Sequence, residues 1–267
     1  MKYLFWNVHR NEDINAIIHE LVIENDISVI VLAEYTANSS DLINLLSSSG
    51  INMQTYTGCS KRISLFSSVS NIDYRTDTDH AIIRIINNRD ILCCVHLNSQ
   101  IYAGNNEIRE IMIEQILGDI RKVEQELSTQ NTIVVGDFNI NPYDPSIVNA
   151  KYFHGIPVFE EAKRGSRIVA GKQFSMFYNP MWNLFGDATP PYGTYYYNGN
   201  DAINTYWNIY DQVIIRPALK PRFDVNNLKI LTETKQRYLL DKNGHPDKCI
   251  SDHLPIIFEI KEDLYEI

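Results

Sequence analysis

The chain has 267 residues, of which 44% are hydrophobic, and carries a formal net charge of −9 with a sequence pI near 5.3. This length suits one large α/β or all-β domain, so we expect a single domain over residues 1–267. The acidic balance argues against high-affinity, non-catalytic DNA binding, because an acidic protein does not hold a polyanion by its overall field. A nucleic-acid or phospholipid substrate would therefore need a local basic patch or a metal ion.

Hydropathy and cysteine usage predict a cytoplasmic protein without a membrane span. No run of eighteen apolar residues is present, and the N-terminal MKYLFWNVHR lacks the apolar region and cleavage site of a signal peptide. The four cysteines have no CxxC spacing, which predicts reduced thiols rather than structural zinc. Cys93 and Cys94 lie in the apolar stretch DILCCVHL, so we expect at least one of them to be buried.

Apolar runs along the chain predict strands, and two stretches have helical periodicity. The helical stretches are Ile14, Ile17, Ile18 and Leu21, and then Ile108, Ile111, Met112, Ile116, Ile120 and Val123. The predicted strands are Tyr3–Val8, Ser28–Ala33, Ile51–Tyr56, Ile63–Ser67, Ala81–Ile86, Ile91–Leu97, Thr132–Val135, Gln212–Ile215 and Pro255–Ile260. A βαβα opening followed by a strand-rich middle indicates an α/β sandwich with mixed sheets.

The segment Phe174–Tyr210 differs from the rest of the chain. It is rich in Tyr, Trp, Asn, Gly and Pro, and it has weak periodicity. It is too aromatic to be disordered, so we expect a long ordered loop with one hairpin. Ordered loops of this length tend to be functional.

Polar side chains stand at the ends of most predicted strands. They are Asn7, Glu34, His96, Asp137 and Asn139 after strands, Asp211 at the start of a strand, and Asp252 and His253 just before the last one. Each residue alone has an ordinary explanation as a turn, cap or solvated strand end. Their shared placement indicates one rim of a sheet instead, since the start of an antiparallel strand lies beside its neighbour's end.

The stretch TIVVGDFNINP, residues 132–142, shows this pattern most clearly. A buried strand ends in Gly136, and Asp137 and Asn139 then follow two residues apart. On an extended backbone this spacing places both side chains on the same side. We therefore expect a carboxylate and a carboxamide to point into one space.

The residue types at the rim fit hydrolysis of a phosphate ester. Glu34, Asp137 and Asp252 offer hard oxygen ligands, which suit Mg²⁺ or Mn²⁺ better than zinc. His253 could act as a general base, and Asp211 could fix its tautomer and stabilise the imidazolium. These are the parts needed for attack of water on a phosphate ester.

The motifs that carry these residues resemble the endonuclease/exonuclease/phosphatase superfamily over nearly the whole chain. In the family's order they are FWNV with Asn7, VLAEY with Glu34, VHLNS with His96, GDFN with Asp137 and Asn139, YDQVII with Asp211, and SDHLPI with Asp252 and His253. The resemblance implies a deoxyribonuclease I-like fold, a four-layer α/β sandwich of two mixed sheets flanked by helices. It also implies a site at one rim.

The same resemblance implies a role for each residue. Glu34 resembles the main metal ligand, assisted by Asn7 and Asp252. Asp137 and Asn139 resemble the pair that orients the water and the phosphate, and Asp211 with His253 resembles the base or electrostatic dyad. His96 resembles a second histidine that binds phosphate or protonates the leaving oxygen. Where deoxyribonuclease I has a glutamate behind that histidine, the stretch GCSKRISLF offers Lys61 and Arg62, which favours phosphate contact by His96.

We therefore expect a metal-dependent phosphodiesterase, in the first place a nuclease with weak sequence preference. The alternatives are a phosphoesterase of the same fold that acts on a phospholipid or small phosphoester, and a catalytically inactive binding module. GDFNINP and YDQVI lack the features of the inositol-phosphatase branch. Candidate substrate contacts are the cations Lys61, Arg62 and Arg109 and the loop aromatics Trp182, Tyr192, Tyr195, Tyr197 and Trp207. No protein partner is implied.

Overall fold

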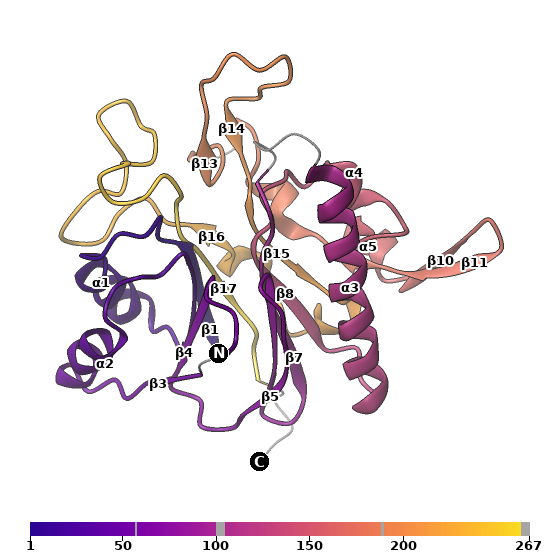
Figure 1. Ribbon diagram of the computed structural model, residues 1–267, viewed down its shortest axis with the longest axis horizontal. Helices are drawn as coiled ribbons and strands as arrows, with labels where there is room; N and C mark the ends of the chain where they lie inside the picture. Colours follow the sequence, from indigo (N-terminus) through magenta and orange to yellow (C-terminus); the bar gives the residue numbers. More distant parts are fainter. Residues whose placement is uncertain (57, 100–104, 188–189, 263–267) are drawn as a thin grey trace.

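Two large mixed sheets pack face to face and are covered by helices on their outer faces (Figure 1). The computed structural model describes residues 1–56, 58–99, 105–187 and 190–262. Helices α1 (Asn15–Asn25) and α2 (Ser39–Ser48) cover one sheet, and α3 (Asn105–Glu126) covers the other. The layers therefore run helix, sheet, sheet, helix, as the sequence predicts. None of the helices in the described part of the chain has the length and apolar character needed to cross a membrane.

The first sheet is built around the N-terminal strand. Its order is β16 (Lys229–Ile230), β17 (Ile256–Glu259), β1 (Lys2–Asn7), β2 (Val29–Ala33), β4 (Ile63–Ser67) and β3 (Gln54–Thr55). The pair β1–β2 is parallel, and the other pairs are antiparallel. The parallel pair brings the C-terminal ends of β1 and β2 to the same edge, which places Asn7 and Glu34 side by side.

The second sheet carries most of the remaining strands. Its order is β5 (Ile72–Asp77), β6 (Ala81–Ile86), β7 (Asp90–His96), β8 (Thr132–Asp137), β15 (Asp211–Ile215), β12 (Phe177–Tyr178) and β9 (Gly155–Ile156). Short helices α4 (Pro145–Val148), α5 (Phe159–Ala162), η1 (Pro180–Leu184), η2 (Pro217–Leu219) and η3 (Val225–Asn227) lie in the connections.

Alternation along the strands divides the core into layers. Tyr3 and Phe5 of β1 pack into the core between the sheets, together with residues such as Val135 of β8. Leu4 and Trp6 point the other way and pack with α1 and α2. Successive side chains of a strand point to opposite faces, so a continuously apolar strand is buried on both of its faces. Both Cys93 and Cys94 are buried, one on each side of β7.

Helix α3 buries the predicted Ile116, Ile120 and Val123, but its N-terminal part buries a different face from the one its sequence suggests. Ile108 and Ile111 are 47% and 67% exposed, whereas Ile113, Ile116 and Ile120 are buried against the second sheet. The buried stripe continues backwards by one turn to position 109, because residues four apart share a helix face. Arg109 is for this reason 1% exposed.

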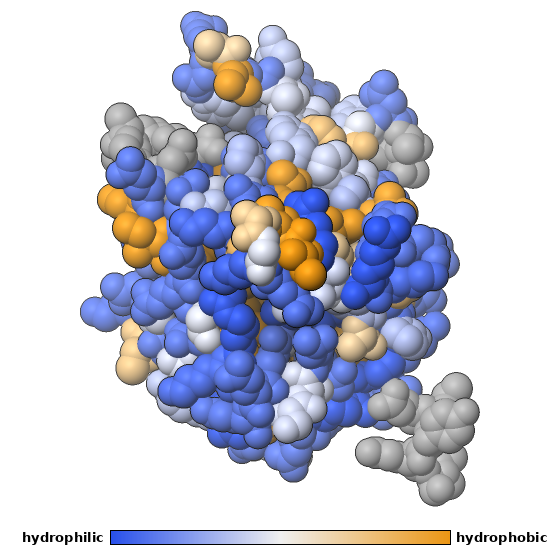
Figure 2. Space-filling model, turned by 90° about the vertical axis from the view of Figure 1, so that its right-hand side faces the viewer, coloured by the Kyte–Doolittle hydropathy of each residue, from blue (hydrophilic) through white to orange (hydrophobic). Residues whose placement is uncertain are grey.

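Two hairpins project from the sandwich. One is β13 (Tyr195–Tyr196) with β14 (Trp207–Asn208), the single hairpin predicted within the aromatic segment. The other, β10 (Ser166–Val169) with β11 (Lys172–Ser175), is not predicted and takes in the start of that segment. The latter faces the viewer in Figure 2, on a largely hydrophilic face, with Ile168 and Val169 74% and 40% exposed.

Candidate active site

The register of three adjacent strands lines up three predicted site residues. His96 of β7 lies opposite Asp137 of β8, and Asp137 lies opposite Asp211 of β15. All three are buried, with exposed fractions of 5%, 1% and 0%. An imidazole and two carboxylates therefore stand in one row across the end of the second sheet.

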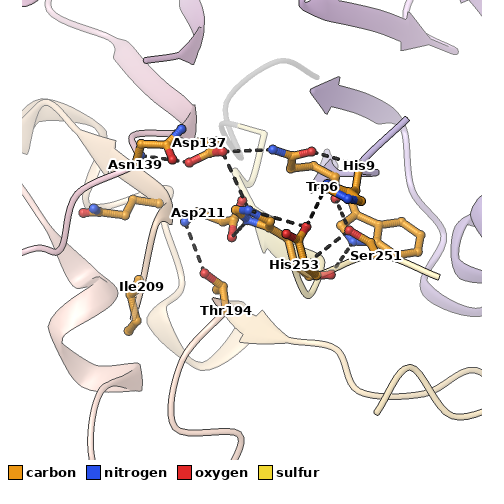
Figure 3. A network of polar contacts seen from close by, with 12 residues as sticks. Trp6, His9, Asp137, Asn139, Thr194, Ile209, Asp211, Ser251 and His253 are labelled. Atoms are coloured by element: carbon orange, nitrogen blue, oxygen red, sulfur yellow. Dashed lines mark hydrogen bonds and ion pairs between the residues drawn. The ribbon is translucent and has the colours of Figure 1, made fainter. Parts of the chain in front are cut away.

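The first sheet and the segment before β17 complete the rim. Asn7 Nδ2 donates to Asp137 Oδ2 at 2.9 Å, which ties the end of β1 to the end of β8 across the two sheets. Glu34 directly follows β2, and its Oε1 is 3.6 Å from His96 Nε2. Figure 3 shows Asp137, Asp211 and His253 pointing toward one another at this edge.

Asp211 and His253 form a buried pair. His253 Nδ1 is 2.8 Å from Asp211 Oδ2, which leaves Nε2 directed toward Asp137 Oδ2 at 4.0 Å. The backbone around His253 is held on both sides, because Trp6 Nε1 donates to its carbonyl and Ser251 Oγ accepts from its amide. A histidine fixed in this way presents one ring nitrogen to the rim.

The surrounding charges decide the protonation of this pair. Burial alone would lower the pKa of His253, but the carboxylates of Asp211, Asp137 and Asp252 outweigh it and raise the pKa to about 10. Burial raises the pKa of Asp211 to about 6, although His253 opposes this shift. Between these two values the pair is a carboxylate and an imidazolium, so without a further cation His253 carries a proton at neutral pH.

Asp137 and Asn139 are held by a turn rather than by an extended strand. The strand β8 ends at Asp137, and Asn139 has φ 53°. Its backbone N–H donates to Asp137 Oδ1 at 2.8 Å, and its side-chain Nδ2 donates to Leu97 O at 2.9 Å. The side chains of Asp137 and Asn139 lie beside each other in Figure 3, and a turn with its own hydrogen bonds, rather than an extended strand, holds Asn139 there.

His96 lies between carboxylates but is not backed by one. Its Nε2 is 3.6 Å from Glu34 and 3.8 Å from Asp137, while its buried Nδ1 has no hydrogen-bond partner among the described residues. Burial lowers the pKa of His96 more than the carboxylates raise it. A neutral imidazole can donate to a phosphate oxygen but has no extra proton to release. The stretch with Lys61 and Arg62 precedes β4 of the first sheet, so it does not pair with β7, whose neighbour is β6. The charge of Arg62 nevertheless acts on His96 and contributes to its lowered pKa.

The geometry and donor chemistry of the rim fit a hard divalent cation. Asp252 Oδ1 and Asp211 Oδ1 are both buried and accept no hydrogen bond from the described residues, although His9 Nδ1 lies 3.2 Å from Asp252 Oδ1. Asp137, Asp211 and His253 also place one ligand atom each within 4.8 Å of one another, so this group could hold an ion. The close hydrogen bond between Asp211 and His253 competes with that use and favours Glu34 and Asp252 as the ligands. Asn7 Oδ1 already accepts from His9 N at 3.0 Å, which leaves it one lone pair.

The predicted substrate contacts lie in different environments. Lys61 and Arg62 are exposed, and Arg62 O accepts from Glu34 N at 3.1 Å. Arg109 is buried on the inner face of α3, so it is not offered to a ligand in solvent. Trp182 packs edge-to-face against Tyr143 at 6.2 Å, with its indole Nε1 buried. Trp182 as a whole is partly exposed.

The aromatic hairpin reaches the buried pair. The ring centroid of Tyr195 is 4.8 Å from that of His253 and 5.1 Å from that of Tyr210. Beside it, Tyr192 packs edge-to-face against Trp207 at 5.9 Å and is 40% exposed. Tyr197 is 36% exposed. Of the predicted aromatics, Tyr195 therefore lies against the buried pair, whereas Tyr192 and Trp207 contact each other in a separate aromatic cluster that includes Tyr196.

Several rim residues are missed by sequence reasoning. Thr194 is fully buried, accepts from Asp211 N at 3.2 Å through its hydroxyl, and accepts from Leu254 N at 2.8 Å through its carbonyl. It has no distinguishing signal, because it lies inside an irregular loop. His9 and Arg10 could have been found, since they are basic residues that closely follow the strand-end Asn7.

Gly136 allows the strands that carry the row to approach one another. A Cβ atom at this position would lie 1.8 Å from Val95 O, which is backbone and cannot move aside cheaply. We expect Gly136→Ala to destabilise the fold by about 3 kcal/mol or more, because overpacking forces backbone shifts. Urea denaturation checks this, with Gly118→Ala as control, since a Cβ at Gly118 meets nothing within 4 Å. Equal stability of the two variants would contradict the prediction.

Two mixed sheets flanked by helices form the deoxyribonuclease I-like fold, and comparison with solved structures shows this fold. The 3′-5′ exonuclease NExo from Neisseria meningitidis matches with a TM-score of 0.59 at 14% identity, over 98% of this chain and 100% of that chain. An AP endonuclease from Archaeoglobus fulgidus matches with a TM-score of 0.57 at 12% identity, over 98% and 100%.

The human Nocturnin catalytic domain, with a bound sulfate anion, matches with a TM-score of 0.58 at 14% identity, over 97% of this chain and 93% of that chain. No family model and no curated protein sequence matches this chain. At these identities the likeness confirms the predicted fold, and the activity must be argued from the rim.

Proposed function

We propose that this protein is a divalent-metal-dependent phosphodiester hydrolase that cleaves nucleic acid with weak sequence preference. The observation that carries the proposal is the buried Asp211–His253 pair, whose ring Nε2 faces the row of Asp137 and His96. A buried acid–base pair on an open rim of carboxylates is an arrangement for moving a proton at a bound phosphate rather than for stabilising a core. The fold supports this, because its solved neighbours include nucleases.

Each residue has a distinct part in the proposed reaction. His253 Nε2 takes the proton of the attacking water, and Asp211 holds its ring and stabilises the resulting charge. Asp137, fixed by Asn7 and Asn139, orients the water. His96, as a neutral imidazole, donates to a phosphate oxygen. When bound by Glu34 and Asp252, a Mg²⁺ or Mn²⁺ ion would polarise the phosphate and counter the carboxylate charge that keeps His253 protonated.

The hairpin whose Tyr195 contacts His253 carries further aromatic rings, which support a substrate with bases. Tyr196 of β13 stacks on His245 with the ring centroids 3.5 Å apart, and Tyr206 and Tyr192 are 56% and 40% exposed nearby. Exposed rings bind bases by stacking, which tolerates any sequence. This attraction would compensate for the net charge of −9. One structure of the neighbour NExo holds a product DNA hairpin.

We expect Tyr192→Ala to raise KM for oligonucleotides by about fivefold or more, because base stacking is worth roughly 1–3 kcal/mol. KM for bis-(p-nitrophenyl) phosphate, which has no base, should change less. The matched control is Tyr238→Ala, an exposed tyrosine on a segment bound to α1 through Lys235 and Glu24. Equal rises of KM for both substrates in Tyr192→Ala would contradict base stacking.

The proposed function is tested by plasmid nicking and RNA degradation with the purified chain. Activity should require Mg²⁺ or Mn²⁺, should stop on addition of EDTA and should fall as salt rises. If the protein cleaves neither DNA nor RNA but hydrolyses sphingomyelin or an inositol phosphate, the nuclease proposal fails and the phosphodiesterase chemistry stands. Inactivity on all of these substrates with both metals would leave the binding-module alternative.

A further inference from the structure

Two basic side chains lie beside the carboxylates proposed to bind the metal. Arg10 Nε is 3.2 Å from Glu34 Oε2, and His9 Nδ1 is 3.2 Å from Asp252 Oδ1. The side chains of Glu34 and Asp252 are only 23% and 18% exposed, whereas that of Arg10 is 76% exposed. Arg10 therefore stands on the solvent side of Glu34, where an incoming ion or phosphate must pass.

The backbone fixes Arg10 in this place. Arg10 N donates to Glu34 O at 3.1 Å, and two residues earlier Val8 N donates to Ala33 O at 3.0 Å. Thr36 Oγ1 donates to Arg10 O at 3.2 Å. Arg10 and Glu34 have φ values of 56° and 53°, a left-handed conformation that residues other than glycine rarely adopt. The pairing is thus part of the rim's construction rather than a chance surface contact.

A guanidinium and a divalent cation compete for the carboxylate of Glu34, because each weakens the binding of the other. Arg10 neutralises Glu34 when no metal is bound, and its charge opposes an ion placed on the same oxygen. A guanidinium released from a carboxylate is well suited to a phosphate, which offers the same forked acceptor geometry. The rim thus provides one arginine with two alternative partners.

We propose that Arg10 couples metal binding to phosphate binding at this rim. With Glu34 taken up by a divalent ion, the guanidinium is released and binds a phosphate of the substrate. By linkage, a phosphate ligand that draws Arg10 away must tighten metal binding by the same factor. The identity of the ligand rests on the proposed function, whereas the competition for Glu34 does not depend on catalysis.

The proposal is tested by isothermal titration calorimetry of Mn²⁺ into the full chain, with and without thymidine 5′-monophosphate. In the natural protein the nucleotide should tighten Mn²⁺ binding about threefold. Arg10→Gln should bind Mn²⁺ about two- to fivefold more tightly than the natural protein, the range that an exposed ion pair allows, and the nucleotide should tighten that affinity by a smaller factor than in the natural protein. Arg10→Lys keeps the charge, so its Mn²⁺ affinity should return toward the natural value.

The control is Arg121→Gln, which removes the same charge from an exposed position on α3 and should leave both affinities unchanged. The proposal is overturned if Arg10→Gln binds Mn²⁺ no more tightly than the natural protein, or if the nucleotide tightens Mn²⁺ binding equally in both. If the chain cleaves no phosphodiester but the Mn²⁺ affinities change as expected, the proposed function fails and the coupling by Arg10 stands.

Discussion

Replacing His253 with alanine is expected to lower kcat for phosphodiester cleavage by about 10²- to 10⁴-fold, the usual contribution of a general acid or base. The Nε2 atom of His253 faces the rim, and its Nδ1 atom is 2.8 Å from Asp211 Oδ2. Removing the ring therefore removes the group that moves the proton. Steady-state kinetics on a fluorescent oligonucleotide, with Mg²⁺ held at saturation, measures the loss.

Adding Asp211→Asn to His253→Ala should cost little more, because Asp211 acts only through the ring that is already missing. Asp211→Asn alone should still lower kcat strongly, since it loses the acceptor that orients the histidine. Both positions are buried, so thermal unfolding of each variant must show that the fold is retained. If the losses of the two single variants multiplied in the double variant, Asp211 and His253 would be acting independently and the dyad would be wrong.

The strands that could be predicted from sequence are those with their own hydrophobic pattern. The bounds of β4 and β6 agree with the predicted Ile63–Ser67 and Ala81–Ile86, because continuous apolar runs between polar turns have few other folds available. The predicted strand Ile51–Tyr56 shortens to the two residues of β3, since only Gln54 and Thr55 pair with β4.

The strands that could not be predicted owe their form to tertiary partners. The strand β10 is four residues long and exposed, so it has no buried apolar face that would predict a strand. The strands β9 and β12 have two residues each. Strands of two residues carry no detectable period, so only their neighbours in the sheet define them. The sequence predicts one hairpin in the aromatic segment Phe174–Tyr210, and β13–β14 is that hairpin. The first two residues of the segment belong to β11 of the other hairpin.

The residue types of the rim could be predicted from the sequence, but their alignment could not. Its composition was predictable because a polar residue at the end of a buried strand is conspicuous. The alignment of His96, Asp137 and Asp211 depends on the register of three strands, which no local pattern encodes. The burial of Arg109 does not follow from the predicted stripe, which begins at Ile108. The stripe that is buried includes Ile113, and Arg109 lies one turn before it on the same helix face.

Glu34→Gln is expected to lower kcat by at least about 10³-fold. The Lewis acidity of a metal ion contributes several kcal/mol to catalysis, and each factor of ten in rate corresponds to about 1.4 kcal/mol. The amide keeps the size of the side chain and loses the charge that a hard cation needs. Stability should change little, since Glu34 lies at the rim with its side chain 23% exposed and its ion pair to Arg10 is open to solvent. Glu126→Gln, at the exposed end of α3, serves as the charge-matched control.

Calorimetric titration of Mn²⁺ into Glu34→Gln then separates two locations for the ion. If Glu34 is the main ligand, the affinity for Mn²⁺ should fall more than tenfold together with activity, since few carboxylates anchor such an ion. If the ion is held instead by Asp137, Asp211 and His253, whose ligand atoms lie within 4.8 Å of one another, Mn²⁺ binding should survive the substitution. Full activity of Glu34→Gln at millimolar Mg²⁺ would exclude Glu34 as the main ligand and leave the buried Asp–Asp–His group as the remaining place for the metal.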